Sequence, residues 1–112
     1  MNMRVHANDG ISAQAQAAFK EQGFTITVNF VPQEELVAFI NKEKVEALLV
    51  RSATKVRKDL IDACPGLKLI GRGGVGMDNI DVAYARGKGI RVVNTPASSS
   101  ISVAELVMAH LF

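Results

Sequence analysis

The sequence predicts one α/β domain, in which a five-stranded parallel sheet carries helices on both faces. Short runs rich in Val, Ile, Leu and Thr alternate with segments of helical spacing along the chain. The runs are nearly continuous in apolar residues, which is typical of parallel strands covered on both faces. With 112 residues, 48% of them hydrophobic, the chain is long enough for one core and too short for two domains. Because parallel strands need crossover connections, we expect a doubly wound sheet of flavodoxin-like strand order.

The first part of the chain predicts two strands joined by a helix. Residues 4–8 (RVHAN) form a short strand run, and residues 25–30 (TITVNF) form a second one rich in β-branched side chains. Between them, residues 12–23 carry apolar side chains at helical spacing, and Ser12 is a suitable N-cap. Asp9 and Gly10 could face the edge at which the strands end, but the turn that leads into this helix explains them more simply.

The middle of the chain predicts a helix followed by a fully buried strand. Residues 32–43 (PQEELVAFINKE) begin with Pro32, which suits a first helical turn, and their charged side chains form a solvated face. The side chains expected to turn inward are Leu36, Phe39 and Ile40. Residues 47–52 (ALLVRS) form the third strand.

The remaining elements continue the alternation. A third helix is predicted at residues 57–64 (RKDLIDAC) and a fourth strand at residues 67–74 (LKLIGRGG). The fourth helix, residues 81–89, has Asp81 as a candidate cap and ends at two glycines. The last strand and the last helix are expected at residues 91–96 (RVVNTP) and 101–112 (ISVAELVMAHLF).

Composition excludes several classes of partner. Thirteen Lys and Arg residues stand against eleven Asp and Glu residues, and because they are scattered they do not predict a nucleic-acid surface. No apolar run approaches the length of a membrane span, and the start has no secretory pattern, so we expect a cytoplasmic protein. Cys64 is the single cysteine and has no neighbouring ligand residues, so we expect neither an internal disulfide nor a metal site.

Polar side chains follow three of the predicted strands directly. Arg51 and Ser52 end the third strand, Arg72 precedes a glycine-rich turn that contains Gly74, and Asn94 ends the fifth strand. Ligands of open parallel sheets bind outside the carboxyl ends of the strands. Two guanidinium groups beside a turn rich in backbone N–H groups are suited to a carboxylate or a phosphate. The sequence therefore predicts a site for a small anionic ligand at this edge.

Other motifs are rejected as functional. Gly71, Gly73 and Gly76 match the spacing of a dinucleotide fingerprint, but the helix inside the motif and the acidic residue at the end of the next strand are both missing. The same turn lacks the Lys and Ser or Thr of a phosphate-binding P-loop. His6 and His110 have no partners arranged as in a catalytic triad.

Residues 49–79 (LVRSATKVRKDLIDACPGLKLIGRGGVGMDN) and 80–106 (IDVAYARGKGIRVVNTPASSSISVAEL) carry a family resemblance. They closely resemble the substrate domain of the D-isomer-specific 2-hydroxyacid dehydrogenases, and within that family the D-3-phosphoglycerate dehydrogenases. VRSATKV and GRGGVGMDNID are the specific motifs, whereas NTP followed by VAEL is shared more widely in the family. Residues 1–48 fit by pattern only.

The resemblance implies roles for individual residues. Arg51 and Arg72 would contact the phosphate or carboxylate of a phosphoglycerate-like substrate, with Ser52 and Gly74 beside them. The backbone N–H groups of Val75 and Gly76 would hold the carboxylate. Val75, which lacks the hydroxyl found in some relatives, and Ser99 would approach the NAD cofactor. Asn94 and Ser99 would line the cleft between two domains.

The resemblance also implies a domain plan. Residues 1–100 would be the substrate-binding domain, and residues 101–112 would begin a helix that crosses into a nicotinamide-binding domain. The chain is then expected to be about a third of an NAD-dependent oxidoreductase, inactive by itself and associated as a homodimer through its apolar last helix. The alternative is a free-standing flavodoxin-like module that binds a small phosphorylated or carboxylic acid without catalysis. A phosphoacceptor receiver domain is excluded, because it needs acidic residues where arginines stand.

Overall fold

The computed structural model describes residues 4–10, 13–51, 54–73 and 79–95, and it describes the backbone alone of Ala15, Gly73, Asn94 and Thr95. Five strands form one parallel sheet with the order β2-β1-β3-β4-β5, which is the flavodoxin-like order, so the predicted fold class is confirmed. The strands are β1 (Arg4–Ala7), β2 (Thr25–Thr27), β3 (Ala47–Val50), β4 (Leu69–Gly73) and β5 (Arg91–Thr95).

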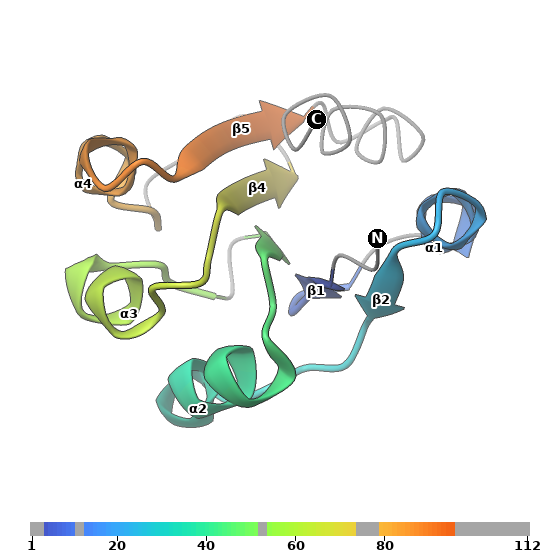
Figure 1. Ribbon diagram of the computed structural model, residues 1–112, viewed down its shortest axis with the longest axis horizontal. Coiled ribbons are helices and arrows are strands. Elements are labelled where there is room, and N and C mark those ends of the chain that lie inside the picture. The colour runs from blue at the N-terminus through green and yellow to red at the C-terminus, as the bar shows by residue number, and fades with distance from the viewer. Residues whose placement is uncertain (1–3, 11–12, 52–53, 74–78, 96–112) are drawn as a thin grey trace.

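The described helices cover both faces of the sheet. Figure 1 shows α1 on one side of the strands and α2, α3 and α4 on the other side. Their bounds are α1 (Ala13–Glu21), α2 (Gln33–Glu43), α3 (Lys58–Ala63) and α4 (Val82–Gly87). The Ser12 cap and the helix expected at residues 101–112 lie outside the described residues.

Side chains of successive strand residues enter two separate cores. In β3, Ala47 and Leu49 pack in the core under α1, whereas Leu48 and Val50 pack in the core under α2, α3 and α4. All four are buried, which explains why the strand is apolar throughout. The larger core also holds Ile70, and each fully buried aliphatic side chain of this kind contributes about 1.5–3 kcal/mol. Leu36 and Ile40 are buried as predicted, and Phe39 is partly buried against the same core.

β2 ends at Thr27, before the predicted end at residue 30, and the side chain of Asn8 binds the chain that follows it. The amide of Asn8 accepts a hydrogen bond from Val31 N at 2.8 Å and donates one to Val31 O at 3.1 Å. These bonds satisfy both backbone groups of Val31 away from the ladder. Phe30 is left 63% exposed.

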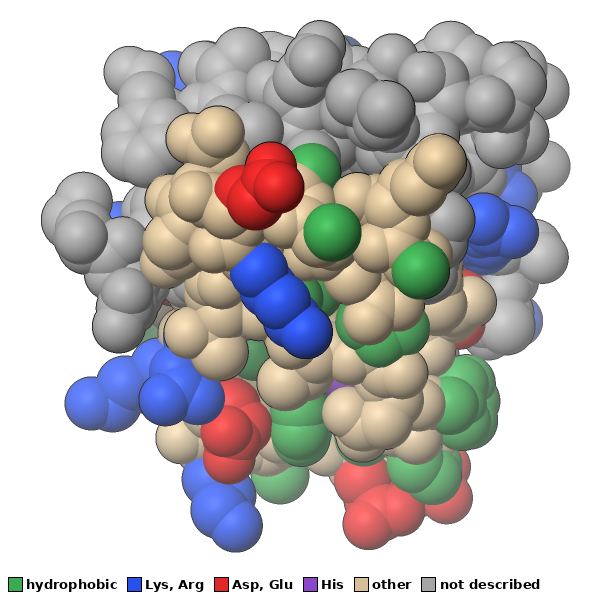
Figure 2. All heavy atoms as spheres, turned by 90° about the vertical axis from the view of Figure 1, so that its right-hand side faces the viewer, with side chains coloured by type: hydrophobic (Ala, Val, Ile, Leu, Met, Phe, Trp, Pro, Cys, Tyr) green, Lys and Arg blue, Asp and Glu red, His purple; other side chains and the backbone are tan. Residues whose placement is uncertain are grey.

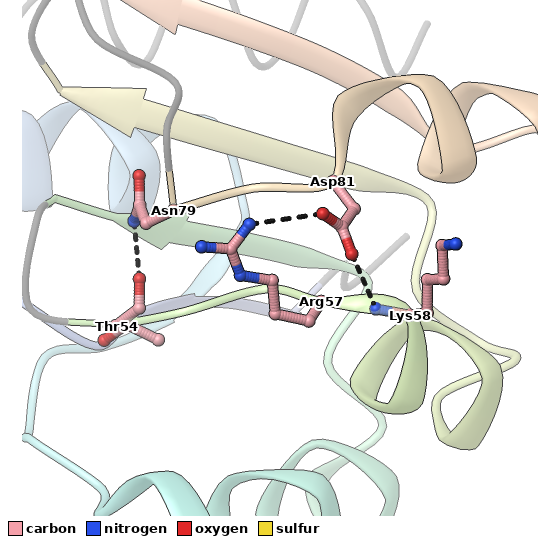
Figure 3. A network of polar contacts seen from close by, with 5 residues as sticks. All are labelled: Thr54, Arg57, Lys58, Asn79 and Asp81. Atoms are coloured by element: carbon pink, nitrogen blue, oxygen red, sulfur yellow. Dashed lines mark hydrogen bonds and ion pairs between the residues drawn. The ribbon is translucent and has the colours of Figure 1, made fainter.

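Asp81 was predicted to cap its own helix, and this prediction is wrong. It occupies the position before α4, but its side chain makes no hydrogen bond to that helix. Instead, its carboxylate accepts hydrogen bonds from Lys58 N at 3.0 Å and from Arg57 Nη1 at 3.2 Å, at the start of α3 (Figure 3). A bridge between Val56 and Ile80 places the two segments side by side, so the side chain caps the neighbouring helix.

Candidate functional site

At the carboxyl edge of the sheet, the ends of β3, β4 and β5 lie side by side. In the sheet register, Arg72 lies between Val50 on β3 and Asn94 on β5. Arg51 follows Val50 directly, so the two arginines stand on adjacent strands within one residue of the same level. The side chain of Arg51 is exposed, and that of Arg72 is half-buried. The fold therefore brings three of the predicted site residues to one edge through their backbones.

The backbone of Arg51 is held on both sides by side chains from other strand ends. Its N–H donates a hydrogen bond to Asp9 Oδ2 at 2.6 Å. Its carbonyl oxygen accepts one from Asn79 Nδ2 at 2.6 Å. The position from which the Arg51 side chain leaves the edge is thus determined by Asp9, after β1, and by Asn79, before α4.

The sequence assigned Asp9 only to a turn, but in the structure its side chain also makes hydrogen bonds to distant parts of the sequence. Its carboxylate accepts hydrogen bonds from Thr54 N at 3.2 Å and Thr54 Oγ1 at 2.6 Å, in addition to the bond from Arg51 N. These partners lie 42 and 45 residues away in the sequence. The signal that could have found Asp9 is its position directly after the first strand, at the same edge as the arginines.

A network of buried side-chain hydrogen bonds supports this edge from the interior. Asn8 binds both backbone groups of Val31, which determines that its Oδ1 accepts and its Nδ2 donates. His6 Nε2 lies 2.9 Å from Asn8 Oδ1, so Nε2 carries the proton and Nδ1 accepts from Thr27 Oγ1 at 2.6 Å. Asn8 Nδ2 also donates to Thr54 Oγ1 at 2.8 Å. The chain of bonds therefore links the edge strand β2 to Thr54.

The buried imidazole belongs to this framework and not to a catalytic pair. His6 is fully buried, and its ring lies 4.5 Å from the Phe39 ring, centroid to centroid. Burial lowers the pKa of His6 from its ordinary 6.5, although hydrogen bonding with the Asn8 side chain and with the backbone of Thr27 acts in the opposite direction. The imidazole is therefore held neutral.

The glycine-rich segment divides between strand and undescribed residues. Gly71 and Gly73 lie in β4, where a dinucleotide fingerprint would turn from strand to helix. A Cβ at Gly71 would stand 2.7 Å from Leu49 Cδ2, so this glycine permits close packing between neighbouring strands. The predicted site residues Ser52, Gly74, Val75, Gly76 and Ser99 lie outside the described residues.

Other kinds of site find no support among the residues that the structure describes. No group of three His, Cys, Asp or Glu side chains there could hold a metal ion. Cys64 is buried, and burial raises its thiol pKa to about 11, so it is an unreactive core residue. In the described part of the chain, no helix has the length and apolar character needed to cross a membrane. On the face shown in Figure 2, acidic and basic side chains are interspersed and form no single basic field.

Comparison with known proteins defines the family. The family model described as "D-isomer specific 2-hydroxyacid dehydrogenase, catalytic domain" matches residues 5–109. The chain therefore belongs to the D-isomer-specific 2-hydroxyacid dehydrogenases, a family of oxidoreductases, and the resemblance seen in the sequence is confirmed.

Individual relatives carry two different substrate names. The chain is 46% identical over 106 residues to a hydroxypyruvate reductase of Thermotoga maritima. This alignment covers 94% of this chain and 34% of the relative. It is 44% identical over 106 residues to a D-3-phosphoglycerate dehydrogenase of Methanocaldococcus jannaschii. That alignment covers 95% of this chain and 20% of the relative. The chain thus spans about a third or less of the length of these relatives.

Solved structures agree with the fold. A Thermus thermophilus protein superimposes on 96% of this chain and 35% of its own length, with a TM-score of 0.75 and 30% identity. A Pyrococcus horikoshii protein covers 97% of this chain and 32% of its own length, with a TM-score of 0.77 and 25% identity. An NAD⁺-bound 3-phosphoglycerate dehydrogenase of Entamoeba histolytica has a TM-score of 0.68 at 24% identity, covering 99% of this chain and 38% of its own length.

Proposed function

We propose that the chain is the substrate-binding part of an NAD-dependent D-2-hydroxyacid dehydrogenase whose substrate is a small phosphorylated 2-hydroxy acid such as 3-phosphoglycerate. The observation that carries this proposal is the placement of Arg51 and Arg72 on adjacent strand ends at the carboxyl edge, in a chain of this family. The M. jannaschii relative named D-3-phosphoglycerate dehydrogenase supports the choice of substrate. Oxidation of 3-phosphoglycerate would place the protein at the first step toward serine, in the cytoplasm.

The proposed role of the arginines follows from their chemistry. A guanidinium offers several N–H donors in a fixed plane, matches two oxygens of a carboxylate or phosphate at once, and stays protonated at physiological pH. Two guanidinium groups at the ends of neighbouring strands would either bind the phosphate and the carboxylate of the substrate, one each, or both bind the same one of these groups. We propose that Ser52, Gly74 and the backbone N–H groups of Val75 and Gly76 complete the site around the carboxylate.

We assign no step of hydride transfer to the described residues. NAD would accept the hydride in the proposed reaction. Gly71 and Gly73 do not form a dinucleotide-binding turn, because both lie within β4. For Val75 and Ser99 we propose only that they contact the edge of the bound cofactor. Proton transfer needs an acid or base within reach of the substrate hydroxyl, whereas His6 is fully buried. We propose that residues 1–112 alone form no NADH from NAD and 3-phosphoglycerate.

The test is an NMR titration of the chain with 3-phosphoglycerate and, separately, with D-glycerate, which lacks the phosphate. We expect 3-phosphoglycerate to shift the amides of residues at the carboxyl edge, and to bind more tightly than D-glycerate. In an intact enzyme, Arg51→Ala and Arg72→Ala should each weaken substrate binding by about 1.5–3 kcal/mol, roughly tenfold to a hundredfold in the dissociation constant.

The matched control is Arg4→Ala. Arg4 begins β1 at the opposite edge, where its guanidinium pairs with Glu43 at 3.1 Å. This variant removes the same charge and should bind 3-phosphoglycerate as the parent chain does. If Arg51→Ala and Arg72→Ala also retain the parent affinity, the arginines are only surface residues and the proposed site is wrong.

A further inference from the structure

Two side chains hold the backbone that carries Arg51, one from each side. Asp9 accepts hydrogen bonds from the N–H groups of Arg51, at 2.6 Å, and of Thr54, at 3.2 Å. Asn79 donates hydrogen bonds from Nδ2 to the carbonyl oxygens of the same two residues, Arg51 and Thr54. Figure 3 shows the Asn79 side chain directed at Thr54. All four backbone polar groups of Arg51 and Thr54 are thus bound by two side chains, which we call the Asp9–Asn79 clamp.

The clamp is anchored in the interior of the domain. Thr54 is 1% exposed, and its hydroxyl accepts a hydrogen bond from Asn8 Nδ2 at 2.8 Å. The hydroxyl proton is therefore available for Asp9 Oδ1, at 2.6 Å. Asn8 in turn binds His6 and Val31, so the position of Asp9 is connected through buried hydrogen bonds to the centre of the sheet. A rigid support of this kind limits how far the backbone of Arg51 can move.

A carboxylate at this position is unexpected if the edge binds an anion. On charge alone, Asp9 would repel a phosphate or carboxylate bound by Arg51. Its carboxylate oxygens, however, receive three hydrogen bonds from N–H and O–H groups of the protein. The carboxylate is directed at the backbone and serves as an acceptor that a neutral amide could not replace, because an amide has one oxygen and one NH₂ group.

We propose that Asp9 is a positioning residue for the anion site. Its carboxylate holds the backbone on both sides of positions 52 and 53 and so sets the place from which Arg51 reaches the substrate. This inference rests on the proposed function, because it presupposes that Arg51 binds the anion. It makes a prediction that is opposite in sign to simple charge repulsion: removal of this negative charge weakens anion binding.

The experiment compares the full 112-residue chain with Asp9→Asn and with Glu21→Gln. Glu21 is an exposed acid at the end of α1, where the chain enters the opposite edge of the sheet, so its variant removes the same charge without touching the clamp. Two quantities are measured by NMR: hydrogen exchange of the Arg51 and Thr54 amides, and binding of 3-phosphoglycerate and of inorganic phosphate.

We expect Asp9→Asn to accelerate exchange at Arg51 and Thr54 and to raise both dissociation constants about tenfold, while Glu21→Gln changes neither quantity. Thr54→Ser, which keeps the hydroxyl, should behave as the parent chain. Thr54→Val, which keeps the charge of Asp9 but removes the hydroxyl, should weaken binding in the same direction. Thr54→Val also provides the test if Asp9→Asn does not fold, as judged by its circular dichroism spectrum.

The two proposals fail differently. Equal or tighter anion binding by Asp9→Asn overturns the positioning role and leaves the proposed function intact. Unchanged amide exchange at Arg51 in Asp9→Asn overturns the clamp itself. A parent chain that binds neither 3-phosphoglycerate nor phosphate overturns the proposed function, and the role of Asp9 in anion binding with it.

Discussion

Replacement of Asn8 by alanine should destabilise the domain more than any surface change of similar size. Asn8 is 2% exposed and makes four hydrogen bonds through its side chain. Asn8→Ala leaves Val31 N–H, Val31 C=O and His6 Nε2–H without these partners. Thr54 keeps its bond to Asp9, so its hydroxyl loses less.

The expected magnitude follows from the number of stranded groups. A buried polar group that loses its partner costs about 1–3 kcal/mol, so three groups at the lower end of that range cost about 3 kcal/mol. A domain of this size has a total stability of roughly 5–15 kcal/mol. Asn8→Ala should therefore still fold, with a Tm lowered by about 12 °C.

The assay is urea unfolding followed by far-ultraviolet circular dichroism, with Asn41→Ala as the control. Asn41 also donates a side-chain hydrogen bond to a backbone carbonyl, that of Ala63 at 2.8 Å, but its contact is exposed. The control should lose less than about 1 kcal/mol. If Asn8→Ala and Asn41→Ala unfold at similar urea concentrations, the buried network contributes little and the reasoning from unsatisfied groups is wrong.

Three further predictions concern pH, helix capping and association. Burial lowers the pKa of His6 below 6.5 in the folded state, so the unfolded state binds more protons at this histidine. The free energy of unfolding should therefore decrease as the pH falls below 6.5, and urea midpoints across that pH range measure the decrease. Asp81→Ala should cost about 1 kcal/mol, because the first turn of α3 loses its cap at Lys58, as unfolding midpoints would record. The apolar segment 101–112 should make the chain a homodimer, which light scattering over a concentration series detects.

Each of these predictions has its own control. A His6→Gln variant should lose much of the pH dependence below 6.5, and an unchanged slope would assign that dependence to other groups. Asp59→Ala changes another acid in the first turn of α3, and a cost equal to that of Asp81→Ala would speak against the cap. A scattering mass that stays monomeric at every concentration would contradict the association through residues 101–112.

The sequence by itself determined the alternation of strands and helices and the family. The period of apolar residues depends only on local geometry, so it located the strands and helices to within a few residues and predicted a parallel sheet. The expected flavodoxin-like strand order does not follow from the period, and the sheet topology confirms it. The motifs around Arg51 and Arg72 indicated the family that the comparison confirmed. The arginines could be assigned to one edge because carboxyl ends of parallel strands always meet there.

Only the tertiary structure decided the partners of the polar side chains. The Asp9 carboxylate binds residues 42 and 45 positions away, and Asp81 caps α3 and not the helix that it precedes. Asn8 binds both backbone groups of Val31, 23 positions away. The physical reason is that a hydrogen bond depends on a distance of about 3 Å between two atoms. That distance is set by strand register and by which loops meet at the edge, and neither is encoded in a local pattern.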